Sequence, residues 1–253
     1  MKRDSECRND TVTRWDLRVV LSSRVPWQPI KRFLLFRIVP SMVIRSKRAR
    51  QSRELPLLSL NLKRLSEEAQ NCRNCDLWQN ATQTVFGEGS ANARIMLIGE
   101  VPGDQEDLQG HPFVGPAGKF LRTKLEEAGI EMKRVYLTNA VKHFKWERRG
   151  KRRIHKKPST GEITACKPWL NAEITALKPK IIVCLGATAA QTLLGRSFRV
   201  TQHRGEFLES TIAPYVMATV HPSAILRAPD EGSRRQQERQ FLADLKKIAA
   251  IRL

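Results

Sequence analysis

The sequence predicts an α/β fold in which helices cover both faces of a central, mainly parallel sheet of four strands. Four short apolar runs have the composition of strands that are buried on both faces. Segments with helical spacing separate these runs, and such alternation of strands and helices is typical of a parallel sheet. The four predicted strands are "ARIMLIGE" (93–100), "VYLTNAVKH" (135–143), "IIVCLG" (181–186) and "YVMATVHP" (215–222).

Five segments are predicted to be helices. "LSLNLKRLSEEAQNC" (58–72) has apolar residues at helical spacing, and "GPAGKFLRTKLEEAGI" (115–130) has a glycine near its end. The helix over 164–179 ends at a proline, which cannot continue it. Two more helices are expected over 187–194 and 234–250. The order of these elements predicts a three-layer αβα domain.

The chain is strongly basic, with 45 Lys and Arg residues against 25 Asp and Glu residues and a formal net charge of +20. Such an excess of positive charge is typical of a protein with a polyanionic partner. Nucleic acid is the leading candidate for that partner, and an anionic membrane surface is the weaker one. A generally basic proteome or a basic tail is the alternative explanation.

Residues 1–54 differ from the rest of the chain because they show neither the period of a helix nor that of a strand. We expect this segment to be a basic, poorly ordered N-terminal extension, and residues 55–253 to form the folded domain. The extension is either an arm that helps to hold nucleic acid or sequence added by an upstream start codon. Its apolar segment 33–44 is too short to span a bilayer.

Polar side chains stand at the carboxyl ends of three predicted strands. Glu100 ends the first strand, Asn139 and His143 end the second, and His221 ends the fourth. Ligands of parallel α/β sheets bind beyond the carboxyl ends of the strands. We therefore expect a carboxylate, an amide and imidazoles to converge on one cleft.

The cysteines indicate a metal site rather than a set of disulfides, because five unevenly spaced cysteines cannot all pair. Cys72 and Cys75 have the Cys-x-x-Cys spacing that zinc and iron–sulfur clusters use. Two further ligands are needed, and Cys166, Cys184 and His143 are the candidates. Cys184 lies in the middle of a predicted strand, where a small buried side chain is usual. Cys166 is better placed, at the start of a predicted helix.

Six motifs in this order resemble the uracil-DNA glycosylase superfamily: "FGEGSANARIMLIGEVPGDQEDLQGHPFVGPAGKFL", "TNAVKHFK", "GKRRIHKKPS", "LGATAAQTLLG", "RVTQHRG" and "ATVHPS". More narrowly, they resemble the UdgX family, an iron–sulfur relative of the family 4 enzymes. The resemblance covers roughly residues 56–250. The basic Lys-Arg-Arg-Ile-His loop is the most specific motif, because ordinary family 4 enzymes lack it.

The resemblance implies roles for the residues of the cleft. Superfamily members flip the uracil nucleotide out of the DNA stack into a pocket. By this match, Phe113 stacks on the base and Asn139 reads its polar edge. His221 donates a hydrogen bond to a uracil oxygen as negative charge develops there. Asp104 and Arg153 are further candidates for substrate binding.

The histidine of the basic loop, His155, is implied to be a nucleophile that takes the place of water and forms a covalent link to the sugar C1′. Such an attack requires a neutral imidazole. The neighbouring cations should lower the pKa of His155 and should also contact the DNA phosphates. Glu100 could orient His155 or stabilise the cationic sugar. The expected cations are Arg152, Arg153, Lys156 and Lys157.

The resemblance also implies a [4Fe–4S] cluster and thereby favours iron–sulfur over zinc. We assign Cys72, Cys75, His143 and Cys166 as its ligands, since His143 stands where family 4 enzymes carry their third cysteine. Cys184 in place of His143 is the alternative. We expect a structural role, in which the cluster ties the first helix to the second strand and braces the basic loop.

Val101 departs from the UdgX pattern, which usually reads Gly-Glu-Gln-Pro-Gly where this chain has Gly-Glu-Val-Pro-Gly. Valine has no side-chain hydrogen-bonding group, so any help that glutamine gives in placing the histidine or the base is absent. Our hypothesis is that covalent trapping is slower or less complete in this chain.

The predicted function is that of a DNA repair protein that excises uracil from DNA and remains linked to the abasic sugar through His155. Single-stranded DNA is the expected preferred substrate, because an unpaired base costs less to extrude. We expect a monomer in the cytoplasm, associated with the nucleoid and not with a membrane. One alternative is a conventional turnover enzyme, in which Glu100 or Asp104 positions water. The other is a non-catalytic binder of damaged or single-stranded DNA, with salt-dependent affinity.

Overall fold

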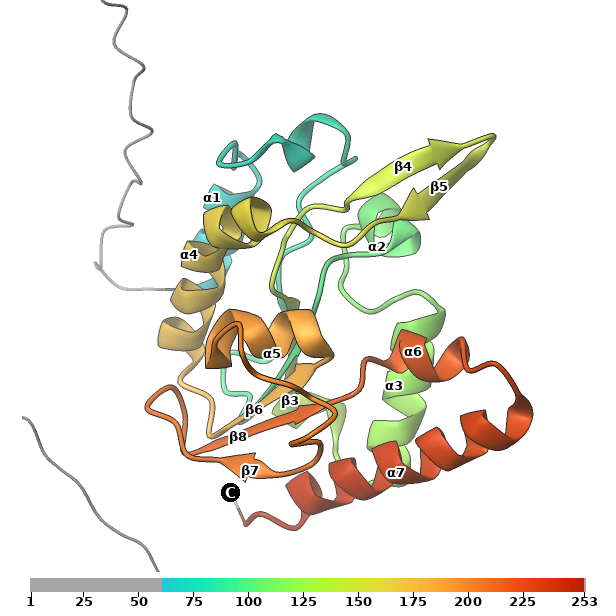
Figure 1. Cartoon of the computed structure of the whole chain (residues 1–253). Coiled ribbons are helices and arrows are strands. Elements are labelled where there is room, and N and C mark those ends of the chain that lie inside the picture. Colours follow the sequence, from blue (N-terminus) through green and yellow to red (C-terminus); the bar gives the residue numbers. More distant parts are fainter. Residues whose placement is uncertain (1–60, 253) are drawn as a thin grey trace, which may run out of the picture. The chain divides into compact units, whose positions relative to one another are not determined.

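The computed structural model describes residues 61–252, and Figure 1 shows how their helices and strands are arranged. The extension that we predicted for residues 1–54 lies outside the described residues, as do residues 55–60 and residue 253. Among the described helices, none combines the length and the apolar composition that crossing a bilayer requires.

A six-stranded sheet forms the centre of the domain, with the strand order β1-β3-β2-β6-β8-β7. The four inner strands run parallel, which confirms the predicted sheet. The two edge strands run antiparallel to their neighbours and were not predicted, because two residues are too few to show a period. The inner strands are β3 (Val135–Asn139), β2 (Ile95–Gly99), β6 (Ile181–Leu185) and β8 (Tyr215–Thr219), and the edge strands are β1 (Glu88–Gly89) and β7 (Phe207–Leu208).

Helices cover both faces of this sheet, so the predicted three-layer α/β class is confirmed. The side chains of β2 alternate between the faces, as those of a strand must. Ile95 and Leu97 belong to a core that includes residues of α3, α6 and α7, whereas Met96 and Ile98 pack with residues of α4 and α5. These helices are α3 (Pro116–Glu127), α6 (Pro222–Leu226), α7 (Glu231–Ala249), α4 (Thr160–Leu177) and α5 (Ala187–Leu194).

A smaller apolar cluster joins α1 (Leu62–Ala69) and the 3-10 turn η1 (Asp76–Gln79) to α4. Helix α4 begins four residues earlier than predicted, because Ser159 and Glu162 form a capping box that satisfies its first amide groups. Cys166 therefore lies inside the helix rather than at its start. A second 3-10 turn, η2 (Met132–Arg134), leads into β3.

The basic stretch that we predicted as a loop is a β-hairpin. Strands β4 (Trp146–Arg149) and β5 (Arg152–His155) pair antiparallel and turn at Gly150, whose φ of +61° suits glycine. Figure 1 shows the hairpin projecting from the body of the domain beside α2 (Asp104–Gln109). Its strands were not predicted, because a run of Arg and Lys lacks the alternation of apolar and polar residues that is typical of a half-buried strand.

Candidate active site

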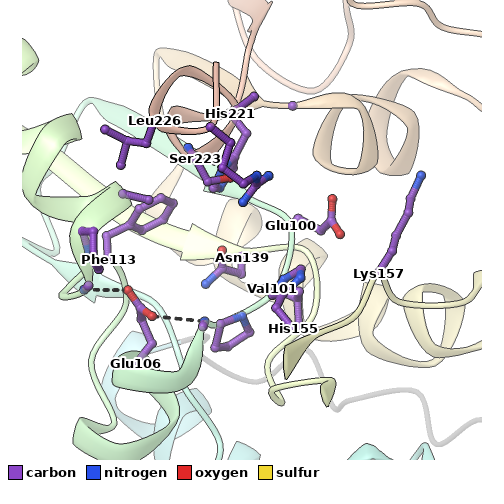
Figure 2. A pocket seen from close by; sticks show the side chains of 18 of the residues that line it. Glu100, Val101, Glu106, Phe113, Asn139, His155, Lys157, His221, Ser223 and Leu226 are labelled. Carbon is purple, nitrogen blue, oxygen red and sulfur yellow. Dashed lines mark hydrogen bonds between the residues drawn. The ribbon is translucent and has the colours of Figure 1, made fainter. Parts of the chain in front are cut away.

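A cleft with a volume of about 780 Å³ opens beyond the carboxyl ends of the parallel strands. Its walls come from the loop after β2, the start of α3, the end of β3, the hairpin and the loop before α6. Figure 2 shows the labelled side chains around it. Of the site residues predicted from the sequence, the cleft is lined by Glu100, Asp104, Phe113, Asn139, His155 and His221.

His143 does not line this cleft, so the expectation that it would join the other strand-end residues is wrong. Its Nε2 atom lies 2.9 Å from Oγ1 of the buried Thr84. The reason is that β3 ends at Asn139 and the chain bends before it reaches His143. The predicted strand was four residues longer than β3, so His143 was expected at the end of the strand, whereas it lies in the segment that follows.

Asn139 and Phe113 meet at a glycine on the floor of the cleft. Gly99, the last residue of β2, is paired in register with Asn139. A Cβ atom at Gly99 would lie 2.2 Å from Asn139 Oδ1 and 2.7 Å from Phe113 Cζ. Only glycine therefore lets the two side chains approach this strand end. Figure 2 shows the Asn139 amide directed into the cleft.

Phe113 has a φ of +57°, a conformation that bulky residues rarely adopt. The start of α3 enforces it, because Gly118 approaches so closely that a Cβ atom there would lie 1.9 Å from the Phe113 carbonyl oxygen. Strained residues of this kind cluster at functional sites. The strain fixes the phenyl ring at the edge of the cleft, where it stacks against the ring of His221 with centroids 6.3 Å apart.

His221 is the N-cap residue of α6, and its Nδ1 atom accepts a hydrogen bond of 3.2 Å from the Ser223 backbone amide. Burial, with smaller effects of Arg227 and His155, lowers the pKa of His221 to about 4. The ring is therefore neutral at pH 7. Nδ1 also lies 2.7 Å from the Ser223 hydroxyl, which can donate to it, so with both Ser223 groups as donors to Nδ1 we assign the single ring proton to Nε2. The helix cap thus selects the tautomer that can donate from Nε2.

Glu106 is a site residue that the sequence analysis missed. Its buried carboxylate accepts hydrogen bonds from the Gly115 amide at 2.8 Å and from the Gly103 amide at 3.1 Å, both drawn in Figure 2. It thereby ties the loop after β2 to the loop that carries Phe113. A signal was present, since Glu106 stands at the third position of a helix that follows a glycine cap.

His155 ends β5 and reaches the cleft from the hairpin. The residue is exposed to the cleft solvent, yet its partial removal from bulk water lowers its pKa. Arg227 lowers the pKa further, and Glu100 acts in the opposite direction. The predicted direction agrees with this, but the predicted cause does not. Burial is the main cause, and the contributing cation comes from the loop after α6.

Arg153 anchors the hairpin to α2. Its Nε atom lies 2.6 Å from Asp104 Oδ1, and one Nη atom lies 2.6 Å from an oxygen of the fully buried Asp107. Its guanidinium also lies over the rings of Phe144 and Trp146. Contact of Arg153 or Asp104 with the substrate would have to compete with these ion pairs. The arrangement fixes β5, and with it His155, relative to the cleft.

Glu100 and Val101 lie in the loop after β2 and line the cleft. The Glu100 carboxylate accepts a hydrogen bond of 2.7 Å from the hydroxyl of Thr188, a buried residue of α5. Val101 lines the cleft and also packs into the apolar cluster of α1, η1 and α4. One residue therefore gives a fixed negative charge to the cleft, and its neighbour gives an apolar surface.

The cleft, with a strained aromatic ring, a strand-end amide and a neutral histidine donor, can hold a flat heterocycle and stabilise negative charge on it. A profile of the uracil DNA glycosylase superfamily matches residues 86–246. The chain belongs to this superfamily.

Several relatives are similar over most of their own length. The type-4 uracil-DNA glycosylase of Sulfurisphaera tokodaii is 39% identical over 180 residues, which are 67% of this chain and 78% of the relative. That of Thermotoga maritima is 38% identical over 172 residues, 68% of this chain and 86% of the relative. That of Archaeoglobus fulgidus is 35% identical over 191 residues, 73% of this chain and 89% of the relative.

Three of the cysteines of this superfamily member lie near one another beside α4. Burial, opposed by Lys142 and assisted by the neighbouring Cys72 and Cys75, raises the pKa of Cys166 to about 12. Two sulfur atoms accept hydrogen bonds of 3.2 Å, Cys72 from the Trp169 indole and Cys166 from the Lys142 amide. These N–H donors would stabilise thiolates that are bound to iron.

Cys184 lies apart from these three, because it is a residue of β6 that packs in the core with residues of α4 and α5, and burial alone raises its pKa. Within residues 61–252, no three His, Cys, Asp or Glu side chains are grouped so as to hold one metal ion. The ligands of a [4Fe–4S] cluster bind separate iron atoms and lie farther apart than the ligands of a single ion.

His143 can leave one ring nitrogen free to bind a metal. With the Thr84 hydroxyl donating to the Ala69 carbonyl, we assign His143 Nε2 as the donor to Thr84 Oγ1, 2.9 Å away. Burial lowers the pKa of His143 to about 4, which leaves the ring neutral with a lone pair on Nδ1. Metal-binding histidines commonly donate their other ring N–H in this way. The residues present therefore fit the ligand set that the resemblance implies.

Proposed function

We propose that this protein excises uracil from DNA and then remains bound to the abasic sugar through His155. The observation that carries the proposal is the convergence of Phe113, Asn139, His221 and His155 on one cleft. The similar relatives are named type-4 uracil-DNA glycosylases, which supports the base-excision part. The resemblance to the UdgX family and the place of His155 at the cleft support the capture part.

The uracil base is recognised by Phe113 and Asn139, two buried residues that line the cleft. A flipped uracil stacks on Phe113, and the Asn139 amide pairs with the polar edge of the base. An amide presents one donor and one acceptor group, so it matches the alternating acceptor and donor of uracil. Cytosine has an amino group in place of the carbonyl and would leave a buried polar group unpaired, which is costly.

His221 assists the breakage of the bond between the sugar and the base by donating a hydrogen bond. As the bond between C1′ and N1 breaks, its electron pair moves to uracil, and negative charge develops on N1 and on the carbonyl oxygens of the base. The Nε2–H group of the neutral His221 donates to the oxygen that gains this charge. Because the donor is held by the α6 cap before the reaction, it stabilises the transition state without reorganisation.

Capture follows at the cation-like C1′. A lone pair of the neutral His155 ring forms the new N–C1′ bond, and the ring becomes positively charged until it loses its N–H proton. The lowered pKa of His155 keeps the ring in its nucleophilic form at neutral pH. The Glu100 carboxylate, fixed by Thr188, stabilises the positive charge on the sugar and then on the imidazole.

DNA binding uses the cations of the hairpin and the cleft rim. The exposed residues Arg148, Arg149, Lys151 and Arg152 extend along the two strands and their turn. Such side chains bind phosphates in a salt-dependent and sequence-independent way. Single-stranded DNA is the preferred substrate in this proposal, bound by a monomer that works at the nucleoid in the cytoplasm.

Cys72, Cys75, His143 and Cys166 would hold a [4Fe–4S] cluster. The cluster supplies a structural cross-link in this proposal and takes no part in the reaction. It would join the turn after α1 to the segment after β3, close to the base of the hairpin. Iron and sulfide analysis, with absorption near 400 nm, tests the assignment, and bound zinc would contradict it.

A turnover glycosylase is the second candidate function. It is favoured by the relatives, which are named type-4 enzymes, and by Val101, which offers His155 no side-chain hydrogen bond. In that mechanism Glu100 orients a water molecule, and the water captures the sugar.

Incubation with a single-stranded oligonucleotide that contains one uracil tests the proposal. We expect free uracil and an adduct that resists heat and SDS, with mass spectrometry placing the nucleotide on His155. His155→Ala should form no adduct. Uracil release without an adduct would identify a turnover enzyme. A gel shift without release would identify a DNA-binding protein that has no glycosylase activity.

A further inference from the structure

Lys142 and Glu173 form an ion pair in the interior of the domain, and neither residue lines the cleft. Their side chains are 1% and 0% exposed, and Lys142 Nζ lies 2.5 Å from Glu173 Oε2. The ammonium group uses its other two donors on Thr138 Oγ1 at 2.6 Å and on the Asn139 carbonyl oxygen at 2.8 Å. All three donors of the lysine therefore have partners.

Glu173 is equally well bound. Its Oε1 atom accepts hydrogen bonds from the Gly87 amide at 3.1 Å, from the Tyr136 hydroxyl at 3.1 Å and from the Thr138 hydroxyl at 2.9 Å. Burying two charges costs more free energy than burying two apolar side chains of the same size, so stability alone does not account for this pair. The hydrogen bonds of Lys142 point to a role in fixing the geometry of its neighbours.

That role is visible at the peptide unit between Asn139 and Ala140. Its N–H group donates to the Gly99 carbonyl at 2.9 Å, and its carbonyl accepts from Lys142 Nζ at 2.8 Å. Asn139 is the last residue of β3, and Lys142, from the segment that follows the strand, binds its carbonyl. Strand β2 thus holds the N–H side of this peptide and Lys142 holds its carbonyl side, and together they fix the direction of the Asn139 side chain.

The same lysine contacts the cysteine site through its main chain. Its amide donates to Cys166 Sγ at 3.2 Å, and its carbonyl accepts from the Val85 amide at 2.8 Å. One residue therefore touches both a proposed cluster ligand and the main chain of the proposed base-reading residue.

We propose that Lys142 and Glu173 are positioning residues that hold the Asn139 amide in register with the uracil edge and link it to the cysteine site. This proposal rests on the proposed function of the cleft. Neither residue touches the substrate, and their effect on the base passes through the peptide unit that follows Asn139.

The test is the double variant Lys142→Met, Glu173→Gln, which removes both charges and leaves no unpaired ion in the interior. We expect its affinity for free uracil, measured by calorimetry, to fall about tenfold, the factor that the loss of one hydrogen bond represents. The preference for uracil over cytosine should fall with it. The melting temperature and the absorption near 400 nm report separately on the fold and the cluster.

A matched control is the double variant Lys145→Met, Glu162→Gln. This ion pair of 2.9 Å also joins the segment after β3 to α4, but it is partly exposed and makes no contact with Asn139. We expect its affinity for uracil to stay within about twofold of the wild type. Equal uracil affinity in the Lys142–Glu173 variant and the control would overturn the proposal.

Lys142→Arg decides the matter if the double variant does not fold. Arginine keeps the buried positive charge, but its planar fork cannot reproduce the three donor directions of an ammonium group. Weakened uracil binding by the folded arginine variant would support the positioning role, and wild-type binding would overturn it. A wild-type protein that neither binds nor releases uracil would instead overturn the proposed function.

Discussion

The two walls of the cleft are built in different ways. On one wall, Asn139 is buried at the end of β3, Phe113 is buried in the loop before α3, and His221 is fixed as a helix cap. On the other wall, His155 stands on an exposed hairpin that is joined to the body through Arg153. The positions of the base-binding side chains are thus set by the core of the fold, whereas the position of His155 depends on the ion pairs of Arg153 at the surface.

His221→Ala should have the largest effect, because it removes the donor of the buried wall. We expect uracil release to slow by about 100- to 1,000-fold, as when one oxyanion donor is lost. Single-turnover release of labelled uracil measures this change. His111→Ala is the control, since His111 is exposed, contacts Glu88 and does not line the cleft. Wild-type release by the His221 variant would show that this wall does not stabilise the leaving base.

Arg153→Ala should separate the two walls. Without the ion pairs to Asp104 and Asp107, β5 loses its fixed position, and we expect adduct formation to slow on the order of tenfold to a hundredfold. Uracil release should change less, because the buried wall is intact. The ratio of adduct to free uracil over time measures the difference.

Arg148→Ala is the matched control for that experiment, since Arg148 pairs with Arg153 across the hairpin but is exposed. It should weaken DNA affinity and leave the ratio of adduct to free uracil unchanged. An equal loss of release and capture in the Arg153 variant would contradict the division of the cleft into two walls.

Val101→Gln should have a smaller and opposite effect. If a side-chain hydrogen bond at this position helps to place His155, the variant should form the adduct about fivefold faster, as one hydrogen bond of about 1 kcal/mol permits. Burying an amide in the apolar cluster should lower the melting temperature. Val101→Ala is the control that changes packing without adding a hydrogen bond. A slower adduct in the glutamine variant would refute the hypothesis about Val101.

The pH dependence of capture should be the smallest effect. His155 attacks in its neutral form, and its pKa lies below the usual 6.5, so the neutral form persists at lower pH than for a free histidine. We expect the adduct rate to fall less than about twofold between pH 8 and pH 6.5, and to fall steeply only below the lowered pKa. A half-maximal rate at pH 6.5 would show that the hairpin leaves His155 unperturbed.

Asn139 and His221 of the buried wall were predictable from the sequence pattern for a local reason, whereas Phe113 was implied only by the family resemblance. Apolar runs mark strands that are covered on both faces, and their ends mark the cleft. Glu100, Asn139 and His221 follow from this rule, which needs no knowledge of how distant segments pack. The rule went wrong at His143 because it depends on the residue at which a strand ends, and strand ends are the least regular part of the pattern.

The hairpin wall was not predictable to the same depth. Its charge marks it as a DNA contact, but the contacts that fix it are between segments far apart in the chain. Arg153 meets Asp107 across 46 residues of sequence, and Arg227, which lines the same cleft as His155, affects the pKa of His155 from the loop after α6. A sequence pattern reports spacing within one element, and it carries no record of such partners.

The bare backbone at Gly99 has a consequence for natural variation. A single added methyl group would overlap both Asn139 and Phe113, so even alanine would displace the two side chains that hold the base in the proposed function. No intermediate side chain exists between hydrogen and methyl. Relatives that use this pocket should therefore keep glycine at the position of Gly99. Relatives that carry any other residue there should have lost the uracil-excising activity of the proposed function.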